Sequence, residues 1–391
     1  MNTPHVQVSS SVVPYWRLSG FYFFYFASLG ALLPYWNPYL KTLGYSSFEI
    51  GFLMAIVMGT KIVAPNIWGW IADHTGKRMF IVRLASFLSV LCFAGVFIHS
   101  GIGWLAIVMI TFSFFWNASL PQFEATTMSH LETDTHRYNV IRMWGSIGFI
   151  IAAVGLGLLV EWKDLSLVPF FILLLFLTIW LSSLVVPEYD NEQVHVEHES
   201  LKKVLMRKEV IALLLSCLLI QASHGAYYTF YSIYLEDYGY SNILIGQLWA
   251  LGVIAEIILF VMMFHLMPRY GARRLFLLAL LLTSVRWVLV SQWPDSLMWL
   301  VVAQLLHAAS FGVVHAVAIH LIHLFFTGKH QGRGQALYSS MSFGVGGALG
   351  SFLSGVMWQS VGGEKVFLMS AVFAVLSFLV AFWGVRESRI N

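Results

Sequence analysis

Twelve long apolar segments, joined mostly by connections of a few residues, dominate this 391-residue chain. A transmembrane helix needs about 20 largely apolar residues at about 1.5 Å of rise each, and every segment meets that length. Only 10% of the residues are charged, whereas a soluble domain carries roughly a quarter, so a soluble enzyme is excluded. The sequence predicts an all-α membrane protein with spans at 15–39, 47–71, 79–99, 102–129, 139–160, 165–186, 209–235, 242–267, 275–293, 296–324, 335–360 and 364–385.

One long polar stretch divides these spans into two sets of six. We predict an N-terminal six-helix bundle over 1–186, a central loop over 187–208 and a C-terminal six-helix bundle over 209–391. The first apolar segment continues past the length of a cleavable signal sequence, so it is expected to remain as the first span. The short connections leave no room for a soluble catalytic domain.

Lysine and arginine are concentrated on one side of the predicted membrane, and the opposite connections hold only Lys41, Lys163 and Lys365. The positive-inside rule makes the crowded side cytoplasmic, with both termini and the central loop on it. We expect a multi-pass protein of a cell inner membrane. The crowded side carries Lys77, Arg78, Arg137, Lys202, Lys203, Arg207, Lys208, Arg269, Arg273, Arg274, Lys329, Arg333, Arg386 and Arg389.

An internal repeat relates the two halves, because segment 39–78 aligns without gaps on 234–273, a shift of 195 residues. Six spans return the chain to the same side, so the repeat is parallel and its axis lies along the membrane normal. Transporters of this build bind substrate between their halves and rock around it. The repeat mates include Gly44/Gly239, Ser46/Ser241, Gly51/Gly246, Gly76/Gly271 and Arg78/Arg273.

The connection after the second predicted span resembles the signature loop of the major facilitator superfamily. It reads Gly69-Trp-Ile-Ala-Asp73-His-Thr-Gly76-Lys77-Arg78, and a degraded copy without the acid begins at Pro268. The resemblance implies the major facilitator fold and a gating loop that locks helix ends in one state and releases them in another. A charged anchor with a turn glycine is the alternative. The implied gating residues are Gly69, Asp73, Gly76, Lys77 and Arg78.

Three more segments resemble the phenylpropionate permease branch of that superfamily, which is related to the lactose and nucleoside proton symporters. They are Arg142-Met-Trp144-Gly145-Ser-Ile-Gly148, Gln221-Ala-Ser-His224-Gly225-Ala-Tyr227-Tyr228 and Trp249-Ala-Leu-Gly-Val-Ile-Ala-Glu256. The resemblance covers essentially the whole chain except the central loop. It implies a proton symporter that works by alternating access.

Ionisable residues at bilayer depth cost about 2.5–3.5 kcal/mol on insertion scales, so each is a functional candidate. Lys61 and Glu256 are repeat mates of opposite charge and could face each other across the centre. Arg286 lies at a depth similar to that of Glu256, and resemblance to the lactose permease relatives implies an acid–arginine pair there and a histidine at His307. Glu256, Arg286 and His307 are the predicted proton-coupling residues; a permanent buried ion pair is the alternative for the first two.

The same relatives carry a glutamate and an arginine that hold the substrate, matched here by Glu124 and Arg142. Trp144 follows Arg142 by two residues and is expected either to face a ring or to pack. Polar side chains on the seventh and tenth spans could line the site or join helices. The predicted substrate-binding set is Glu124, Arg142, Trp144, Lys61, His224, Tyr228 and His315.

Transport accounts for the spans, the repeat and the buried charges. A membrane-embedded enzyme or sensor is the remote alternative, because the sequence contains no catalytic motif. The embedded cations exceed the embedded acids by one, which favours an aromatic monocarboxylate such as 3-phenylpropionate as substrate. A neutral sugar or nucleoside is the alternative.

The expected partners are a small-molecule substrate, protons and the lipid bilayer. The net charge of +3 is too small to indicate a nucleic-acid partner. No cofactor or metal is expected beyond the proton gradient, although sodium remains an alternative coupling ion. The chain is expected to be a monomer.

Overall fold

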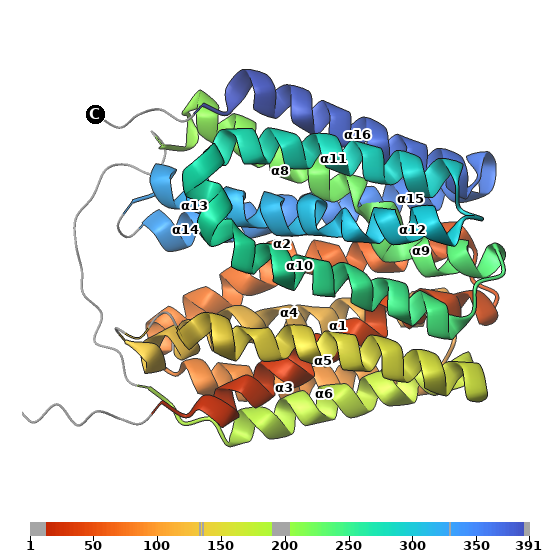
Figure 1. The fold of residues 1–391 in the computed structure, drawn as a ribbon. Coiled ribbons are helices and arrows are strands. Elements are labelled where there is room, and N and C mark those ends of the chain that lie inside the picture. Colours follow the sequence, from red (N-terminus) through yellow and green to blue (C-terminus); the bar gives the residue numbers. More distant parts are fainter. Residues whose placement is uncertain (1–12, 133, 135–136, 190–203, 328–329, 387–391) are drawn as a thin grey trace, which may run out of the picture.

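The computed structural model describes residues 13–132, 134, 137–189, 204–327 and 330–386. Within these residues, twelve helical segments are long and apolar enough to cross a membrane, as the sequence predicts (Figure 1). The helices are α1 (Tyr15–Thr42), α2 (Ser47–Thr75), α3 (Arg78–Phe93) with η1 (Ala94–Phe97), α4 (Ile102–Leu131), α5 (Arg137–Trp162), η2 (Leu165–Leu167) with α6 (Val168–Leu184), α8 (Lys208–Ser223) with α9 (Gly225–Asp237), α10 (Asn242–Tyr270), α11 (Ala272–Gln292), α12 (Leu297–Leu305) with η3 (Ala308–Val313) and α13 (Val314–Phe325), α14 (His330–Ser339) with η4 (Ser340–Gly346) and α15 (Gly347–Val361), and α16 (Gly363–Gly384).

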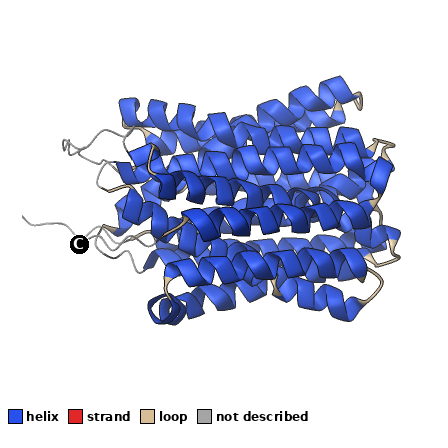
Figure 2. Cartoon of the chain, turned by 90° about the horizontal axis from the view of Figure 1, so that it is seen from above, coloured by secondary structure: helices blue, strands red, loops and turns tan. Residues whose placement is uncertain are grey.

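Both ends of the described chain lie at the same end of the bundle (Figures 1 and 2). We call the end where α1 begins and α16 ends the terminal face, and the opposite end, with connections 43–46 and 238–241, the distal face. The terminal face is the one predicted to be cytoplasmic. Several predicted residues of this face lie outside the described residues: Lys202, Lys203, Lys329 and Arg389.

The repeat mates build the same turn twice. Gly44 and Gly239 both adopt a positive φ, 87° and 83°, which glycine adopts without steric cost. Two residues later, the Ser46 hydroxyl accepts a hydrogen bond from the backbone of Glu49, and the Ser241 hydroxyl accepts one from Leu244. Each serine caps a helix start that would otherwise leave backbone donors unpaired. The sequence repeat therefore specifies how the second helix of each half begins.

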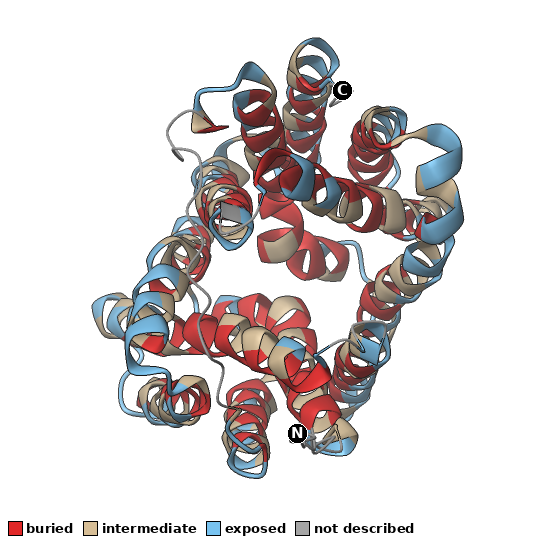
Figure 3. Ribbon diagram, turned by 90° about the vertical axis from the view of Figure 1, so that its left-hand side faces the viewer, coloured by how far each residue is buried: buried red, intermediate tan, exposed pale blue. Residues whose placement is uncertain are grey.

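The buried apolar side chains form two clusters. One comes mostly from residues 18–186 and the other mostly from 204–385. Seen from the terminal face, the helices form two groups whose exposed residues lie on the outer rim (Figure 3). The boundary at 187–208 stays a prediction, because residues 190–203 of the central loop lie outside the described residues.

The two helix groups approach most closely near the distal face, where α2 packs on α15 and α5 packs on α10. A Cβ atom on Gly51 would lie 2.6 Å from the Cα atom of Gly355. A Cβ atom on Gly246 would overlap the carbonyl oxygen of Ala153. The same carbonyl accepts a 2.6 Å hydrogen bond from the Tyr35 hydroxyl. The repeat mates Gly51 and Gly246 therefore have the same role: each lets its helix approach the backbone of the other half closely. We call these backbone contacts the distal seal.

Polar contacts across the halves surround the distal seal. The amide of Asn37 donates to the carbonyl of Tyr228 at 3.2 Å, and Lys41 forms an ion pair with Asp237. Sequence reasoning missed this ion pair. The sequence contained a signal for it: Lys41 lies on the side with few basic residues, and Asp237 follows the seventh predicted span on that same side.

Candidate functional site

Arg142 on α5 and Glu256 on α10 face the interface between the halves at the same depth. The rings of Phe149 on α5 and Trp249 on α10 meet across this interface, with centroids 6.5 Å apart. Arg142 precedes Phe149 by seven residues and Glu256 follows Trp249 by seven, so each lies about 10 Å closer to the terminal face on the same helix side. Arg142 and Glu256 therefore lie across the interface from each other.

Glu124 and Arg142 are brought together, as the resemblance implied. Arg142 Nε lies 3.7 Å from Glu124 Oε1, and the Tyr138 hydroxyl donates to that oxygen at 3.4 Å. The guanidinium carbon lies 3.8 Å from the ring centroid of Phe26, a cation–π distance. The Arg142 and Glu124 side chains remain 31% and 37% exposed. Because both face the interface between the halves, this exposed surface is available to a ligand inside the bundle.

Glu256 contacts a histidine rather than the predicted arginine. His307 Nε2 lies 3.7 Å from Glu256 Oε2, and both side chains are largely shielded. Among the described residues, no ion pair joins Glu256 to Arg286. The expectation of a direct Glu256–Arg286 pair is therefore wrong for this conformation, whereas Glu256 and His307 are neighbours. A carboxylate beside an imidazole is an arrangement that can pass a proton between two groups.

Arg286 is fully buried and is held by neutral groups. Its Nη1 donates to the Ser310 hydroxyl at 2.8 Å, and its Nη2 donates to Gln304 Oε1 at 3.5 Å. The guanidinium carbon lies 4.4 Å and 4.2 Å from the ring centroids of Tyr227 and Trp287. Cation–π contacts of this kind stabilise a desolvated arginine. The group is thus a fixed positive charge behind the Glu256–His307 pair.

His224 belongs to the shell around this arginine. Its Nδ1 lies 2.8 Å from the carbonyl of Ile220, and its Nε2 lies 3.3 Å from Ser310 Oγ. A neutral ring that donates from Nδ1 can accept at Nε2, which suits a neighbour of a guanidinium. The predicted Tyr228 stacks on His224 with centroids 5.8 Å apart, while its backbone carbonyl takes part in the distal contacts through Asn37.

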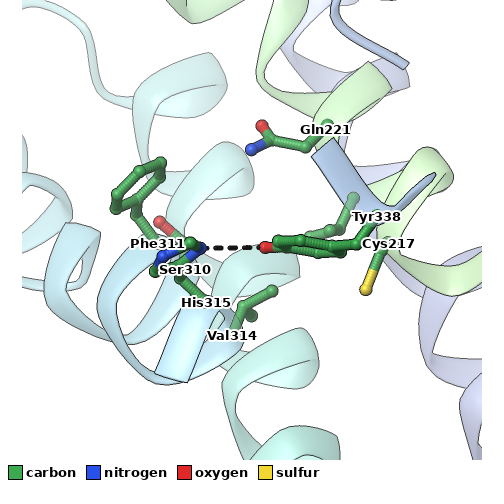
Figure 4. A pocket seen from close by; sticks show the side chains of 8 residues that line it. Cys217, Gln221, Ser310, Phe311, Val314, His315 and Tyr338 are labelled. Atoms are coloured by element: carbon green, nitrogen blue, oxygen red, sulfur yellow. Dashed lines mark hydrogen bonds between the residues drawn. The ribbon is translucent and has the colours of Figure 1, made fainter. Parts of the chain in front are cut away.

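His315 lies on the same helix side as His307, with Phe311 between them. The ring centroids are 5.6 Å apart for His307 and Phe311 and 5.9 Å apart for Phe311 and His315. His315 Nδ1 lies 3.0 Å from the hydroxyl of Tyr338, beside a small cavity (Figure 4). We call His307, Phe311 and His315 the aromatic stack. The sequence indicated the two histidines but not the phenylalanine between them.

Trp144 contacts aromatic residues at the start of α1 rather than Glu124 or Arg142. Its indole nitrogen donates to the Tyr15 hydroxyl at 2.9 Å, and its ring lies 5.5 Å from that of the exposed Trp16. Both partners belong to the first turn of α1, at the terminal face. Packing is therefore the better reading of Trp144, and Phe26 is the aromatic ring that lies against Arg142.

Lys61 faces the interior of the bundle. Val57 and Ala64, one turn away on either side, are fully buried, whereas Val63 and Ile67 on the opposite side of α2 are exposed. The Lys61 side chain is partly exposed. Within the described part of the chain, no ion pair or hydrogen bond to its ammonium group is found. Lys61 and Glu256 are not paired, so the predicted contact between these repeat mates is absent from this conformation.

The predicted gating residues hold three helices of one half together. Arg78 Nη2 lies 2.6 Å from Asp73 Oδ1, and its Nη1 donates to Gln122 Oε1 on α4 at 2.9 Å. Asp73 lies inside α2 rather than beyond its end, because the helix continues to Gly76, which caps it at φ 69°. Lys77 and Gly69 complete the loop sequence: Lys77 precedes α3, and Gly69 faces Gln122.

Curated proteins of similar sequence are transporters. The chain is 30% identical over 367 residues to a probable 3-phenylpropionic acid transporter of Escherichia coli (strain K12). The alignment covers 92% of this chain and 95% of the relative. It is 24% identical to the maltose permease of Geobacillus stearothermophilus, over 94% of each chain.

Solved structures with the same fold are also transporters. A variant of the nucleoside transporter NupG superposes with a TM-score of 0.84 at 16% identity, over 95% of this chain and all of that one. An inward-facing bacterial homologue of the lysosomal transporter Spinster gives 0.72 at 14% identity, over 97% of this chain and 100% of that one. The model of the MFS_1 like family matches residues 15–369. The chain thus belongs to the MFS_1-like family of the major facilitator superfamily, and it is a membrane transporter rather than an enzyme.

Proposed function

We propose that this transporter is a proton symporter of an aromatic monocarboxylate of the 3-phenylpropionate type. The observation that carries the proposal is a partly exposed guanidinium inside the bundle whose terminal nitrogens form no hydrogen bond to another described residue. Arg142 contacts Glu124 only through Nε, and neither of its terminal nitrogens hydrogen-bonds to another described residue. Two parallel nitrogens form the fork that binds a carboxylate in a bidentate manner. Lys61 supplies a second accessible cation.

The proton is assigned to Glu256 and His307. When Glu256 is ionised, its charge opposes entry of an anion near Arg142, because both residues face the same interface. A proton on Glu256 removes that repulsion, so proton and carboxylate bind together. Arg286 stays positive in every step because a guanidinium is too basic to lose its proton, and hydrogen bonds and aromatic rings stabilise its buried charge. With the terminal face cytoplasmic, the closed distal seal corresponds to an inward-facing state.

A neutral sugar or nucleoside is the second candidate. It is favoured by the relatives, which include a maltose permease and a nucleoside transporter. In that case the Glu124–Arg142 pair would bind hydroxyl groups instead of a carboxylate. The 30% identity to the probable 3-phenylpropionic acid transporter favours the acid.

The test is the pH outside lightly buffered, de-energised cells that express the protein, in sodium-free medium. The panel contains 3-phenylpropionate, maltose and uridine, each also added to cells without the protein. Alkalinisation on adding the aromatic acid alone supports the proposal. Alkalinisation with maltose or uridine alone supports the second candidate, and uptake that requires sodium contradicts proton coupling.

Arg142→Lys is expected to raise the half-saturation concentration for the aromatic acid about ten-fold. The lysine keeps the positive charge but loses the planar fork, and a hydrogen bond to a charged group contributes roughly 1.5–3 kcal/mol. The measurement is initial uptake against substrate concentration in proteoliposomes. An unchanged half-saturation concentration would remove Arg142 from the site. Arg137→Lys, at the terminal face, is the matched control.

Lys61→Met is expected to weaken binding of 3-phenylpropionate about five- to ten-fold and to leave binding of 3-phenylpropanamide unchanged. The methionine keeps much of the side-chain length but removes the charge that would attract a carboxylate. Displacement of a radiolabelled substrate from purified protein measures both compounds. Equal weakening of acid and amide would mean that Lys61 serves packing only. Lys365→Met, on the exposed distal face, is the control.

A further inference from the structure

We propose that Phe311, supported by Phe343 on the neighbouring helix, forms the surface that recognises the aromatic ring of the substrate. The inference rests on the function proposed above and adds the element that selects for the ring. It divides the recognition between the halves. The first half supplies the cations for the carboxylate, Lys61 on α2 and Arg142 on α5, and the second half supplies the aromatic surface.

The three rings of the aromatic stack are nearly parallel. The ring planes of Phe311 and His307 differ by 14°, and those of Phe311 and His315 by 12°. Phe343 of η4 meets Phe311 with centroids 6.1 Å apart and planes inclined by 52°, so the two phenylalanines form a corner. Aromatic rings bind other rings in offset or edge-on arrangements at such distances. A corner of this kind offers both arrangements to a phenyl group.

The aromatic stack lies beside the interface between the halves. At one end His307 contacts Glu256, which faces the interface, and at the other end His315 contacts the hydroxyl of Tyr338. Phe311 lies between these two positions and is partly exposed, whereas its chain neighbours Ser310 and Gly312 are buried. The exposed part of the Phe311 ring is the surface assigned to the phenyl group, and the ring also lines the small cavity beside His315 and Tyr338 (Figure 4).

The backbone explains why the three rings align. In a regular α-helix, residues eight positions apart are rotated by about 80° from each other. The segment η3, Ala308–Val313, is a π-helix, whose wider turn offsets part of that rotation. The π-turn thus keeps three residues at four-residue spacing on the same side of the helix. A π-turn is rare and is often associated with a functional site.

The test compares two acids of the same length, 3-phenylpropionate and 3-cyclohexylpropionate. Both carry the carboxylate, but only the first has an aromatic face. Purified full-length protein in nanodiscs binds each acid in a displacement assay. Phe311→Leu is expected to weaken the phenyl acid roughly three- to ten-fold and the cyclohexyl acid less than two-fold, since leucine retains apolar surface but no aromatic face. Phe343→Leu is expected to have a smaller effect of the same kind.

Phe260→Leu is the matched control, because Phe260 lies on the exposed side of α10. It should leave both affinities unchanged. Equal weakening of the two acids by Phe311→Leu, or no effect on either, would overturn the assignment of Phe311 while leaving the proposed function intact. Failure of the wild-type protein to bind either acid would overturn the proposed function and this inference together. If Phe311→Leu does not fold, the same comparison with Phe343→Leu decides the question.

Discussion

Glu256→Gln is expected to abolish accumulation of substrate driven by a pH gradient and to leave substrate exchange across the membrane. Symport of one proton with one monocarboxylate moves no net charge, so only the pH gradient drives it, with about ten-fold accumulation per pH unit. Glutamine keeps the size and polarity of the side chain but cannot lose a proton. The variant therefore behaves as a carrier with the proton permanently bound.

The measurement uses proteoliposomes with an imposed pH gradient, and protein-free liposomes correct for diffusion of the neutral acid. Initial uptake should fall to the protein-free rate in Glu256→Gln, while counterflow from substrate-loaded liposomes continues. Glu209→Gln, near the terminal face, should behave as the wild type. Gradient-driven uptake that survives in Glu256→Gln would show that the coupling proton binds elsewhere.

Gly51→Val is expected to reduce transport more than ten-fold by preventing closure of the distal face. The Cβ atom alone would lie 2.6 Å from Gly355, and the contact is with backbone that cannot rotate away. Overpacking of a tight contact costs about 1–3 kcal/mol, which shifts a two-state equilibrium by roughly 5- to 150-fold. The variant should accumulate in the conformation with the distal side open.

Cysteine labelling measures that shift. A cysteine at Asn37, which makes a distal contact in this structure, should react faster with a water-soluble maleimide in Gly51→Val than in its parent. Gly59→Val on the same helix is the matched control, because a Cβ atom there would meet nothing within 4 Å. Normal transport by Gly51→Val would mean that the distal seal does not take part in the cycle.

The spans and the repeat could be predicted because they depend on local patterns. Apolar length determines a membrane helix, and turn glycines with serine caps recur at fixed spacing, as in Gly44 with Ser46 and in Gly239 with Ser241. The ends of the helices were less predictable. The apolar part of a helix can end before the helix itself ends. The helix α2 accordingly extends past the polar Asp73 to Thr75.

The contacts inside the bundle depend on helix rotation, which the sequence fixes less well. Glu124 and Arg142 were paired correctly because the resemblance supplied both residues. Glu256 was assigned to Arg286 on similar depth and on the same resemblance, but neither says which side of a helix a residue occupies in this conformation. The π-turn before Val314 changes that rotation on the tenth span, and no simple signal in the sequence indicates it. Phe311 was missed for the same reason.

The distal seal has a consequence for leakage. Its closest layer, Gly51 on Gly355 and Gly246 on Ala153, consists of glycine and alanine backbone, and its titratable neighbour, the Tyr35 hydroxyl, already carries its proton at neutral pH. Acidifying the medium therefore cannot loosen this layer by protonating it, and salt cannot screen it as it would screen the ion pair of Lys41 and Asp237 outside it. If the proposed proton coupling holds, the distal face is thus closed by a contact that acid in the medium does not weaken.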